Sequence, residues 1–187
     1  MASTSSRKDV EILFDGFIPE KTFDVLAHGD CWNNNFLFRY DENDIPIDVR
    51  FVDLQCSRKA SPATDILYFF YTSLSGDFRV EKMNYMVSIY YKSFCEVLSR
   101  AEKSPPFSYE ELILEVKNRR IFGLSVGVLV LSVVLSEDTD TLYDKTLPDN
   151  CSEGQNKSVK AFLDSENPLQ KRLLSMFDEF IEYDLFN

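Results

Sequence analysis

Three oxygen-bearing side chains in the first third of the chain suit the transfer of a phosphoryl group. Asp30 and Asn35 are separated by four residues in the stretch HGDCWNNNF, and Asp53 follows in VDLQ. Phosphoryl transfer to a hydroxyl needs a base that accepts the hydroxyl proton and oxygen ligands for Mg²⁺. We therefore predict that Asp30 is the base and that Asn35 and Asp53 hold the metal.

Other chemistry for the same stretch is less well supported. Cys31 has no histidine at nucleophile spacing other than His28, so a thiol nucleophile is disfavoured. One histidine and two carboxylates leave few ligands for a two-metal hydrolase. His28 is more often a structural hydrogen-bonding group in such a position, and Trp32 is more often a packing residue than a substrate platform. Asn33 and Asn34 suit turns and are assigned no role.

These residues lie in a loop that leads into a predicted β-hairpin. Asparagine and aspartate favour loops because their side chains bond nearby backbone groups, whereas Phe-Leu-Phe suits a half-buried strand. We predict strands over residues 36–40 and 47–55, joined by the turn DENDIP. A hairpin centred near Asp44 would set Asn35 roughly opposite Asp53, so that the two predicted metal ligands meet at its open end.

Helices are predicted for most of the chain after the hairpin. Ser61 is a predicted N-cap, with Pro62 at the first helical position, of a helix that Gly76 would end. The following helix has one apolar face at helical spacing and stops before Pro105 and Pro106. That face consists of Val80, Met83, Val87, Tyr90, Tyr91, Phe94, Val97 and Leu98.

Two more helices are predicted towards the C-terminus. Ser108 and Glu111 fit a capping box that opens one long helix into the apolar run 121–135. A polar surface loop follows, and a closing helix begins near Asn167. The apolar stripe of the closing helix consists of Leu169, Leu173, Leu174, Phe177, Phe180 and Ile181.

One hairpin followed by helices predicts an α+β fold that is mainly α. The chain shows no internal repeat and no low-complexity linker, so we treat residues 1–187 as a single unit. Within this unit, residues 1–8 are predicted to be frayed and residues 9–17 to form a short helix that Pro19 ends.

The composition argues against several classes of partner. Twenty basic and thirty-one acidic residues give a net charge of −11, which disfavours nucleic acid and anionic membranes as partners. The four cysteines show no CxxC or metal-finger spacing and the N-terminus has no signal-peptide core, so a reduced, cytoplasmic protein is expected. The apolar run 121–135 is fifteen residues long, too short for a membrane span.

Three ordered motifs resemble a known family of kinases. HGDCWNNNFLF, VDLQ and SPATDILYFFYTSL resemble the ecdysteroid kinase-like family, also called CHK-kinase-like, which is related to choline kinases and aminoglycoside phosphotransferases. The resemblance runs from about Phe23 to the end of the chain and is clearest over residues 26–75. It implies the C-terminal lobe of a protein-kinase-like fold, in which the hairpin carries the catalytic loop and the metal site.

The resemblance also implies a role for individual residues. It makes Asp30 the catalytic base, and it makes Asn35 and Asp53 the magnesium ligands. It gives His28 a structural place in the catalytic loop, and Asp65 the task of bracing the backbone of that loop. Without the resemblance, Asp65 would be assigned as a complement to the helix dipole in the first turn of its helix. Leu54 stands where the family more often has Phe, which exchanges one apolar side chain for another.

The implied activity is ATP-dependent phosphorylation of a hydroxyl on a steroid- or choline-like small molecule, with ATP and Mg²⁺ as cofactors. The glycine-containing loop and strand lysine of a nucleotide lobe are not found, so we expect a partial or truncated chain. The alternative is a non-catalytic binding or regulatory protein with a kinase fold. The sequence leaves open the nucleotide-binding residues, the acceptor's identity and the oligomeric state.

Overall fold

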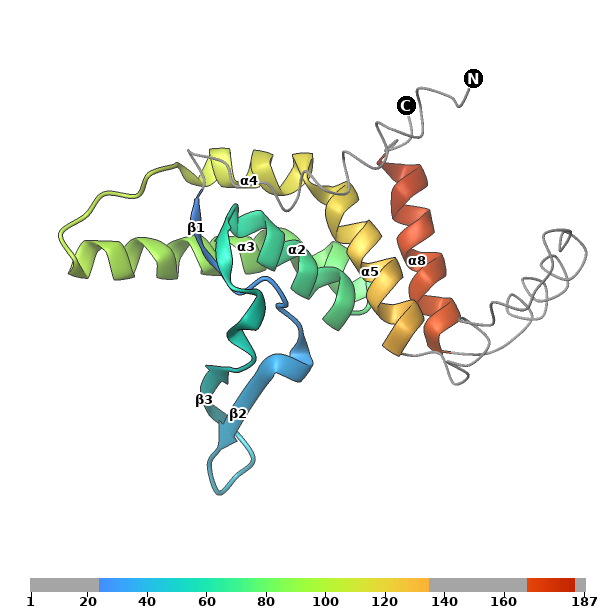
Figure 1. Cartoon of the computed structure of the whole chain (residues 1–187), viewed down its shortest axis with the longest axis horizontal. Coiled ribbons are helices and arrows are strands. Elements are labelled where there is room, and N and C mark those ends of the chain that lie inside the picture. Colours follow the sequence, from blue (N-terminus) through green and yellow to red (C-terminus); the bar gives the residue numbers. More distant parts are fainter. Residues whose placement is uncertain (1–23, 135–167, 184–187) are drawn as a thin grey trace, which may run out of the picture. The chain divides into compact units, whose positions relative to one another are not determined.

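The computed structural model describes residues 24–134 and 168–183 of the chain (Figure 1). The predicted helix at 9–17, the frayed segment 1–8 and the polar loop after residue 135 lie outside the described residues. The strands are β1 (Val25–Ala27), β2 (Phe36–Tyr40), β3 (Pro46–Phe51) and β4 (Arg58–Ala60). The α-helices are α2 (Pro62–Ser73), α3 (Gly76–Arg100), α4 (Tyr109–Asn118), α5 (Arg120–Val134) and α8 (Pro168–Glu182).

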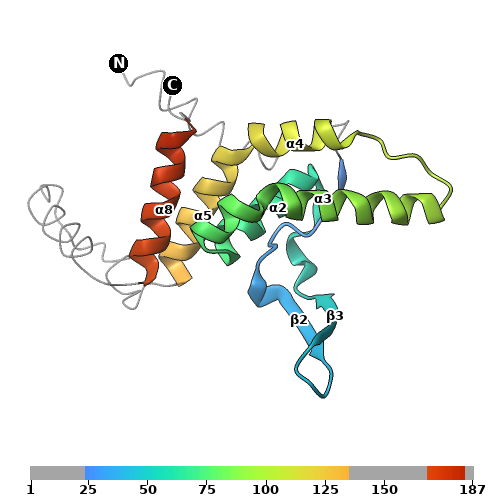
Figure 2. The ribbon, with the colours of Figure 1, turned by 180° about the vertical axis from the view of Figure 1, so that it is seen from behind.

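The chain divides into two compact units, residues 1–127 and residues 128–187. The first unit holds all four described strands, in two small antiparallel sheets, together with α2, α3 and α4. The prediction of a mainly helical α+β fold is therefore confirmed. Figure 2 shows from behind how the β2–β3 hairpin projects from the helices of the first unit.

The register of the hairpin differs by one residue from the prediction. Phe36 pairs with Phe51, and the Val52 N–H donates to the Asn35 carbonyl over 3.0 Å, so Asn35 lies opposite Val52 and not Asp53. The register changes once along the hairpin, because Tyr40 pairs with Pro46 whereas Arg39 pairs with Asp48, which leaves one extra residue in β3. The second strand also ends at Phe51, four residues earlier than predicted, and a short 3₁₀ turn (Leu54–Cys56) follows.

A second sheet, which the sequence analysis missed, closes the base of the loop over residues 28–35, which we call the functional loop. Strands β1 and β4 pair antiparallel, with Val25 opposite Ala60 and Ala27 opposite Arg58. Ala27 and Ala60 are fully buried, and β1 packs on α2. The segment 28–57, which includes the hairpin, is therefore an excursion whose two ends are tied together.

Helix α2 begins as predicted but ends differently. The Ser61 hydroxyl accepts a hydrogen bond from the Ala63 N–H, with Pro62 in the first turn. Gly76 does not end this helix: α2 stops at Ser73, and Gly76 is the first residue of α3. We attribute the end of α2 to the side chain of Arg79, which lies in the first turn of α3.

The Arg79 guanidinium is completely buried between the two helices that it joins. Its Nη1 donates to the Phe70 and Leu74 carbonyls, each over 3.3 Å, and its Cζ lies 4.3 Å from the centre of the Tyr71 ring. Carbonyls at a helix C-terminus lack helical partners and carry partial negative charge, so a buried cation there stabilises the end of α2.

Helix α3 buries less of its apolar face than predicted. Met83 and Val87 are buried, but Val80 is 50% and Val97 64% exposed, so the predicted apolar face is only partly buried. The C-terminal half of α3 instead packs sideways on the segment that leads into α4. Phe94 stacks on Phe107 at 5.2 Å between ring centres. Because α3 makes these contacts on one side only, the opposite edge of its apolar face remains exposed.

The predicted long helix after Ser108 is two helices. The capping box is confirmed, since the Ser108 hydroxyl accepts from the Glu111 N–H and the Glu111 carboxylate accepts from the Ser108 N–H. The helix is interrupted at Arg119, which pairs with Glu115 in a buried salt bridge. Neither proline nor glycine marks this break, so the sequence offered no local signal for it.

Gly123 allows α5 to approach α2 closely. A Cβ atom at this position would lie 2.7 Å from Tyr71 Cδ2 and 2.9 Å from Leu67 Cβ. Both distances are shorter than normal carbon contacts, so a side chain at residue 123 would push the two helices apart. Gly123 is buried in this contact.

In the second unit, helix α8 starts at Pro168, within one residue of the predicted start. Leu173, Met176 and Phe180 are buried, whereas the predicted core residues Leu174, Phe177 and Ile181 are 42–75% exposed. The buried stripe is thus narrower than the set of apolar residues and shifted towards Met176. No helix within the described residues is long and apolar enough to cross a membrane.

Candidate functional site

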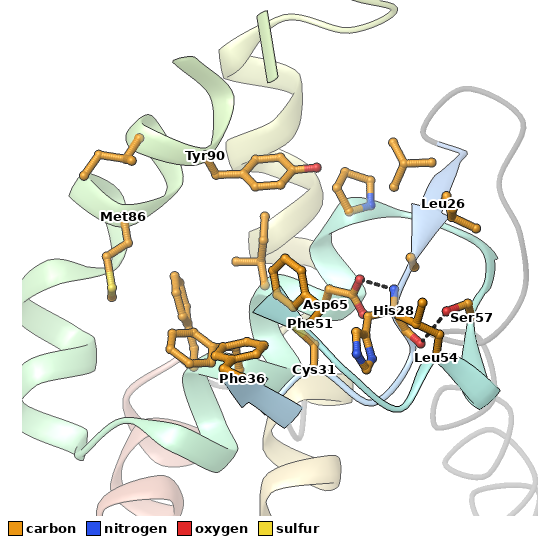
Figure 3. Close-up of a pocket in the computed structure, with 17 residues that line it drawn as sticks. Leu26, His28, Cys31, Phe36, Phe51, Leu54, Ser57, Asp65, Met86 and Tyr90 are labelled. Atoms are coloured by element: carbon orange, nitrogen blue, oxygen red, sulfur yellow. Dashed lines mark hydrogen bonds between the residues drawn. The ribbon is translucent and has the colours of Figure 1, made fainter. Parts of the chain in front are cut away.

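Asp65 holds the backbone at the start of the functional loop. Its two carboxylate oxygens accept hydrogen bonds from the His28 N–H (2.6 Å) and the Gly29 N–H (2.9 Å). Figure 3 shows Asp65 facing the His28 backbone, with the Ser57 hydroxyl at the His28 carbonyl on the other side. One carboxylate on α2 thereby fixes two consecutive peptide groups, because hydrogen bonds to a charged acceptor are short and strong.

The His28 ring links the loop to the end of β3. Its Nε2 lies 2.9 Å from the Val52 carbonyl, and its Nδ1 lies 3.3 Å from the Asp30 N–H. The carbonyl requires a donor and the N–H requires an acceptor, so these contacts assign the neutral ring with its proton on Nε2. The edge of the ring also contacts Phe51, at 5.9 Å between ring centres. His28 therefore ties Asp30 to the strand that precedes Asp53.

Gly29 is required by the path of the loop. Its φ is +84°, a conformation that side chains other than glycine rarely adopt. A Cβ atom here would also overlap the Cys56 carbonyl oxygen and the Arg58 guanidinium. Only glycine satisfies both conditions, and it lets the loop pass directly beside the 3₁₀ turn that follows Asp53.

The Asp30 carboxylate is held from two directions. The Tyr68 hydroxyl donates to Oδ1 over 2.7 Å, and the Asn35 Nδ2 donates to Oδ2 over 2.8 Å. Asn35 Nδ2 also lies 2.9 Å from the Asp30 carbonyl. Burial raises the pKa of the Tyr68 hydroxyl well above its ordinary value, and the hydrogen bond to Asp30 raises it further. Tyr68 is therefore a neutral donor to Asp30.

Asn35 and Asp53 were predicted from the sequence to hold a metal ion. Asn35 is buried and directs its amide nitrogen to Asp30, which leaves its amide oxygen as the remaining polar atom. Asp53 is exposed and lies one residue beyond Val52, the partner of Asn35 across the hairpin. Within residues 24–134 and 168–183, no three His, Cys, Asp or Glu side chains cluster to hold a metal. An amide and a carboxylate oxygen nevertheless fit Mg²⁺, which needs few protein ligands when phosphates supply others.

Asp53 has an unusual backbone conformation. Its φ and ψ are both 60°, in the left-handed region, at the junction between β3 and the 3₁₀ turn. Such a conformation costs on the order of 1 kcal/mol in a residue other than glycine, and strained residues concentrate at functional sites. The left-handed turn separates Asp53 from the strand and changes the direction of its side chain.

Cys31, directly after Asp30, is unsuited to nucleophilic chemistry. Burial raises the pKa of its thiol to about 12, with further increases from the negative charges of Asp65 and Asp30. The reactive thiolate is therefore scarce at neutral pH. The raised pKa supports the prediction that Cys31 itself is not a nucleophile.

A comparison with protein-family models identifies the chain. The model of the ecdysteroid kinase-like family matches residues 5–103, just over half of the 187 residues. The chain belongs to the ecdysteroid kinase-like family. The match begins earlier than the resemblance predicted and ends well before the C-terminus. No curated protein and no solved structure matches the chain. Membership of this family implies a kinase-like phosphotransferase that uses ATP and acts on a small molecule.

The structure of this ecdysteroid kinase-like chain brings most of the predicted residues together. His28, Asp30, Asn35 and Asp65 are joined by hydrogen bonds, whereas Asp53 is connected to them only through Val52. Sequence analysis missed two residues of the site, Tyr68 and Gly29. Tyr68 follows Asp65 by three positions in α2, a spacing that places both side chains on one face of a helix. That spacing was the available signal for Tyr68.

Proposed function

We propose that this chain carries the catalytic residues of an ATP-dependent phosphotransferase that phosphorylates a hydroxyl group. The observation that carries the proposal is the Asp30 carboxylate, held by Tyr68 on one oxygen and by Asn35 on the other. Two donors from different elements fix the plane of the carboxylate before any substrate is bound. Such fixed geometry accounts for a large part of catalysis in phosphoryl transfer, where the protein mainly positions reactants.

Asp30 is the proposed base. An ionised carboxylate has about four lone-pair sites, so each oxygen of Asp30 can accept a further hydrogen bond beside those from Tyr68 and Asn35. The acceptor's hydroxyl would donate to one of these sites and release its proton to Asp30 while its oxygen attacks the γ-phosphorus of ATP. The bond from that phosphorus to the β,γ-bridging oxygen would break, and ADP would leave. Because Asp30 is half-buried, water can be displaced from it by the acceptor.

Asn35 and Asp53 are the proposed magnesium ligands. When bound, Mg²⁺ would neutralise negative charge on the phosphates of ATP. Asn35 would contribute its amide oxygen, because its amide nitrogen donates to Asp30. The same side chain would then align the base and hold the metal, which couples the two halves of the reaction.

The remaining residues of the site are proposed as supports. Asp65 would brace the loop through His28 and Gly29, and His28 would fix the distance between the loop and β3. We propose further that residues 1–187 form one protein-kinase-like C-terminal lobe and that the acceptor is steroid- or choline-like. The competing proposal, a binding or regulatory protein without turnover, keeps the same hydrogen bonds and differs only in activity.

A transfer assay separates the two proposals. The protein is incubated with Mg²⁺ and ATP labelled on the γ-phosphate, together with neutral sterols bearing hydroxyls and with choline, and labelled organic phosphate is measured. Asp30→Asn should lower the transfer rate at least about 100-fold, since it removes the base. The matched control Asp77→Asn changes an exposed carboxylate in α3 and should leave the rate unchanged. Equal rates in wild type and Asp30→Asn would contradict the proposal.

A further inference from the structure

A cavity of about 690 Å³ lies beside the functional loop in the first unit (Figure 3). We call it the loop cavity. His28, Cys31 and Asp65 line it, whereas neither Asp30 nor Tyr68 is among its lining residues. The cavity therefore touches the residues that brace the loop but not the carboxylate that we propose as the base. Its volume falls within the range of 300–1,000 Å³ that is usual for small-molecule sites.

The walls of the loop cavity come mainly from α2, α3, β1 and the ends of the hairpin. Helix α2 contributes a single face, since Pro62, Ile66 and Phe69 recur at helical spacing. Helix α3 contributes Met86, Ile89 and Tyr90, strand β1 lies along another side, and the ends of the hairpin supply Phe36 and Phe51. Most of these side chains are apolar. A cavity with such walls favours an apolar occupant, because burying apolar surface is favourable.

The charges of the lining exclude one broad class of ligand. No lysine or arginine lines the loop cavity among the residues that the structure describes, and the ionisable carboxylate there is that of Asp65. A phosphate or a fatty-acid carboxylate would meet this negative charge without a compensating cation, which is unfavourable in a partly desolvated site. We therefore infer that the described lining favours a neutral molecule over a nucleotide.

Tyr90 supplies a polar group in the apolar wall. Its ring points into the loop cavity in Figure 3, and the residue is half-buried, so its hydroxyl is open to a partner that enters the cavity. Burial raises the pKa of Tyr90 to about 12, and the charge of Asp65 contributes to the increase. The hydroxyl is therefore a neutral donor at physiological pH. A ligand oxygen that enters the cavity would replace water as the acceptor for this hydroxyl.

We propose that the loop cavity binds a neutral, mainly apolar small molecule with one hydroxyl or carbonyl group, at a site separate from the acceptor site at Asp30. Its oxygen pairs with the Tyr90 hydroxyl, and its apolar body packs on Ile66, Met86 and Phe51. Because the occupant also lies against Asp65, it stabilises the bonds from Asp65 to the His28 and Gly29 amides. Occupancy of the cavity thus tightens the loop that positions Asp30.

Binding of Nile red, a neutral apolar dye with a carbonyl group, tests the site without ATP or an acceptor. We expect saturable binding of one dye per full-length chain, detected by its fluorescence. Ile89→Asp places a charge in the wall and should weaken binding at least about tenfold. Val80→Asp is the matched control: Val80 is on the same helix and is 50% exposed, against 46% for Ile89, but does not line the cavity. It should bind the dye as wild type does.

Three further measurements address the hydroxyl, the loop and the separation from Asp30. Tyr90→Phe keeps the ring and should weaken dye binding a few-fold. Hydrogen exchange at the His28 and Gly29 amides should slow when the dye is bound. Asp30→Asn should bind the dye with unchanged affinity. Thermal melting of each variant establishes that it is folded.

The outcomes that overturn the proposal are distinct from failure of the phosphotransferase proposal, because none of them depends on transfer. Dye binding that does not saturate, or that Ile89→Asp and Val80→Asp affect equally, shows general surface adsorption. Loss of dye binding in folded Asp30→Asn places the dye at the acceptor site and removes the separate site. Self-association that Ile89→Asp abolishes, without dye binding, assigns the cavity to a second copy of this chain.

Discussion

At the scale of single side chains, the site depends on how Asp30 is oriented. The Tyr68 hydroxyl and the Asn35 amide each fix one oxygen of its carboxylate. The pair Asp30 and Asn35 was predictable from sequence because both stand in one short loop. Tyr68 was not predicted, because it lies 38 positions from Asp30 and only the packing of α2 beneath the loop brings them together.

The contribution of Tyr68 can be measured by removing its hydroxyl alone. Tyr68→Phe keeps the ring but frees one oxygen of Asp30, so the carboxylate can rotate. If the chain transfers phosphate as proposed, kcat should fall about tenfold while KM for ATP stays unchanged, because the base is misaligned and not removed. Tyr85→Phe, which changes an exposed tyrosine of α3, is the control. A wild-type kcat in Tyr68→Phe would contradict this role.

The positive φ of Gly29 allows a second test at the scale of single residues. Gly29→Ala combines an unfavourable φ with overlap of the Cys56 carbonyl, so we expect a loss of about 3 kcal/mol in the free energy of unfolding. Gly76→Ala, at a glycine without positive φ in the first turn of α3, should change stability by less than about 1 kcal/mol. Denaturant unfolding measures both, and equal values would refute the conformational argument.

The chemistry of Cys31 gives a prediction that depends on pH. Its pKa of about 12 means that the protonated thiol persists in the folded protein as pH rises above the ordinary value of 9.0. At about pH 8, iodoacetamide should label the exposed Cys56 much faster than Cys31 in native protein, and both at similar rates in denaturant. Peptide mass spectrometry distinguishes the sites. Rapid native labelling of Cys31 would show that its thiolate is accessible.

At the scale of elements, the sequence correctly predicted features that residues close together in the chain determine. The N-cap at Ser61, the capping box at Ser108 and the hairpin turn were predicted because each depends on residues within a few positions. The failures share another cause. The end of α2 depends on Arg79, and the break between α4 and α5 coincides with the buried pair of Glu115 and Arg119; both depend on packing.

The capping box makes a quantitative prediction for α4. Ser108→Ala removes the acceptor for the Glu111 N–H and should destabilise the first unit by about 1 kcal/mol. The matched control is Ser99→Ala, which changes an exposed serine near the end of α3 and should alter stability by less than about 0.5 kcal/mol. Both are read from the midpoint of denaturant unfolding. An unchanged midpoint for Ser108→Ala would show that the box contributes little.

At the scale of the whole molecule, the family could be predicted because its motifs are short and ordered along the chain. The complete arrangement of the site residues could not be predicted, because the β1–β4 pairing that closes the functional loop joins segments more than thirty positions apart. The net charge of −11 repels ATP as a whole, so a nucleotide site must rely on local donors and on Mg²⁺. Metal and nucleotide binding should therefore be strongly coupled.

That coupling can be tested by thermal unfolding during a Mg²⁺ titration, with and without ATP, of the wild-type chain and Asp53→Asn. Asparagine tolerates the left-handed backbone of residue 53, so the variant removes the carboxylate charge with little added strain. Our account predicts that Mg²⁺ and ATP together raise the Tm of the wild type and that the variant loses this effect. At a hundredfold excess of ligand over its Kd, the free energy of unfolding should increase by about 2.7 kcal/mol. A wild-type chain that unfolds cooperatively but gains no stability, or a variant that gains as much, would contradict the assignment of a metal–nucleotide site.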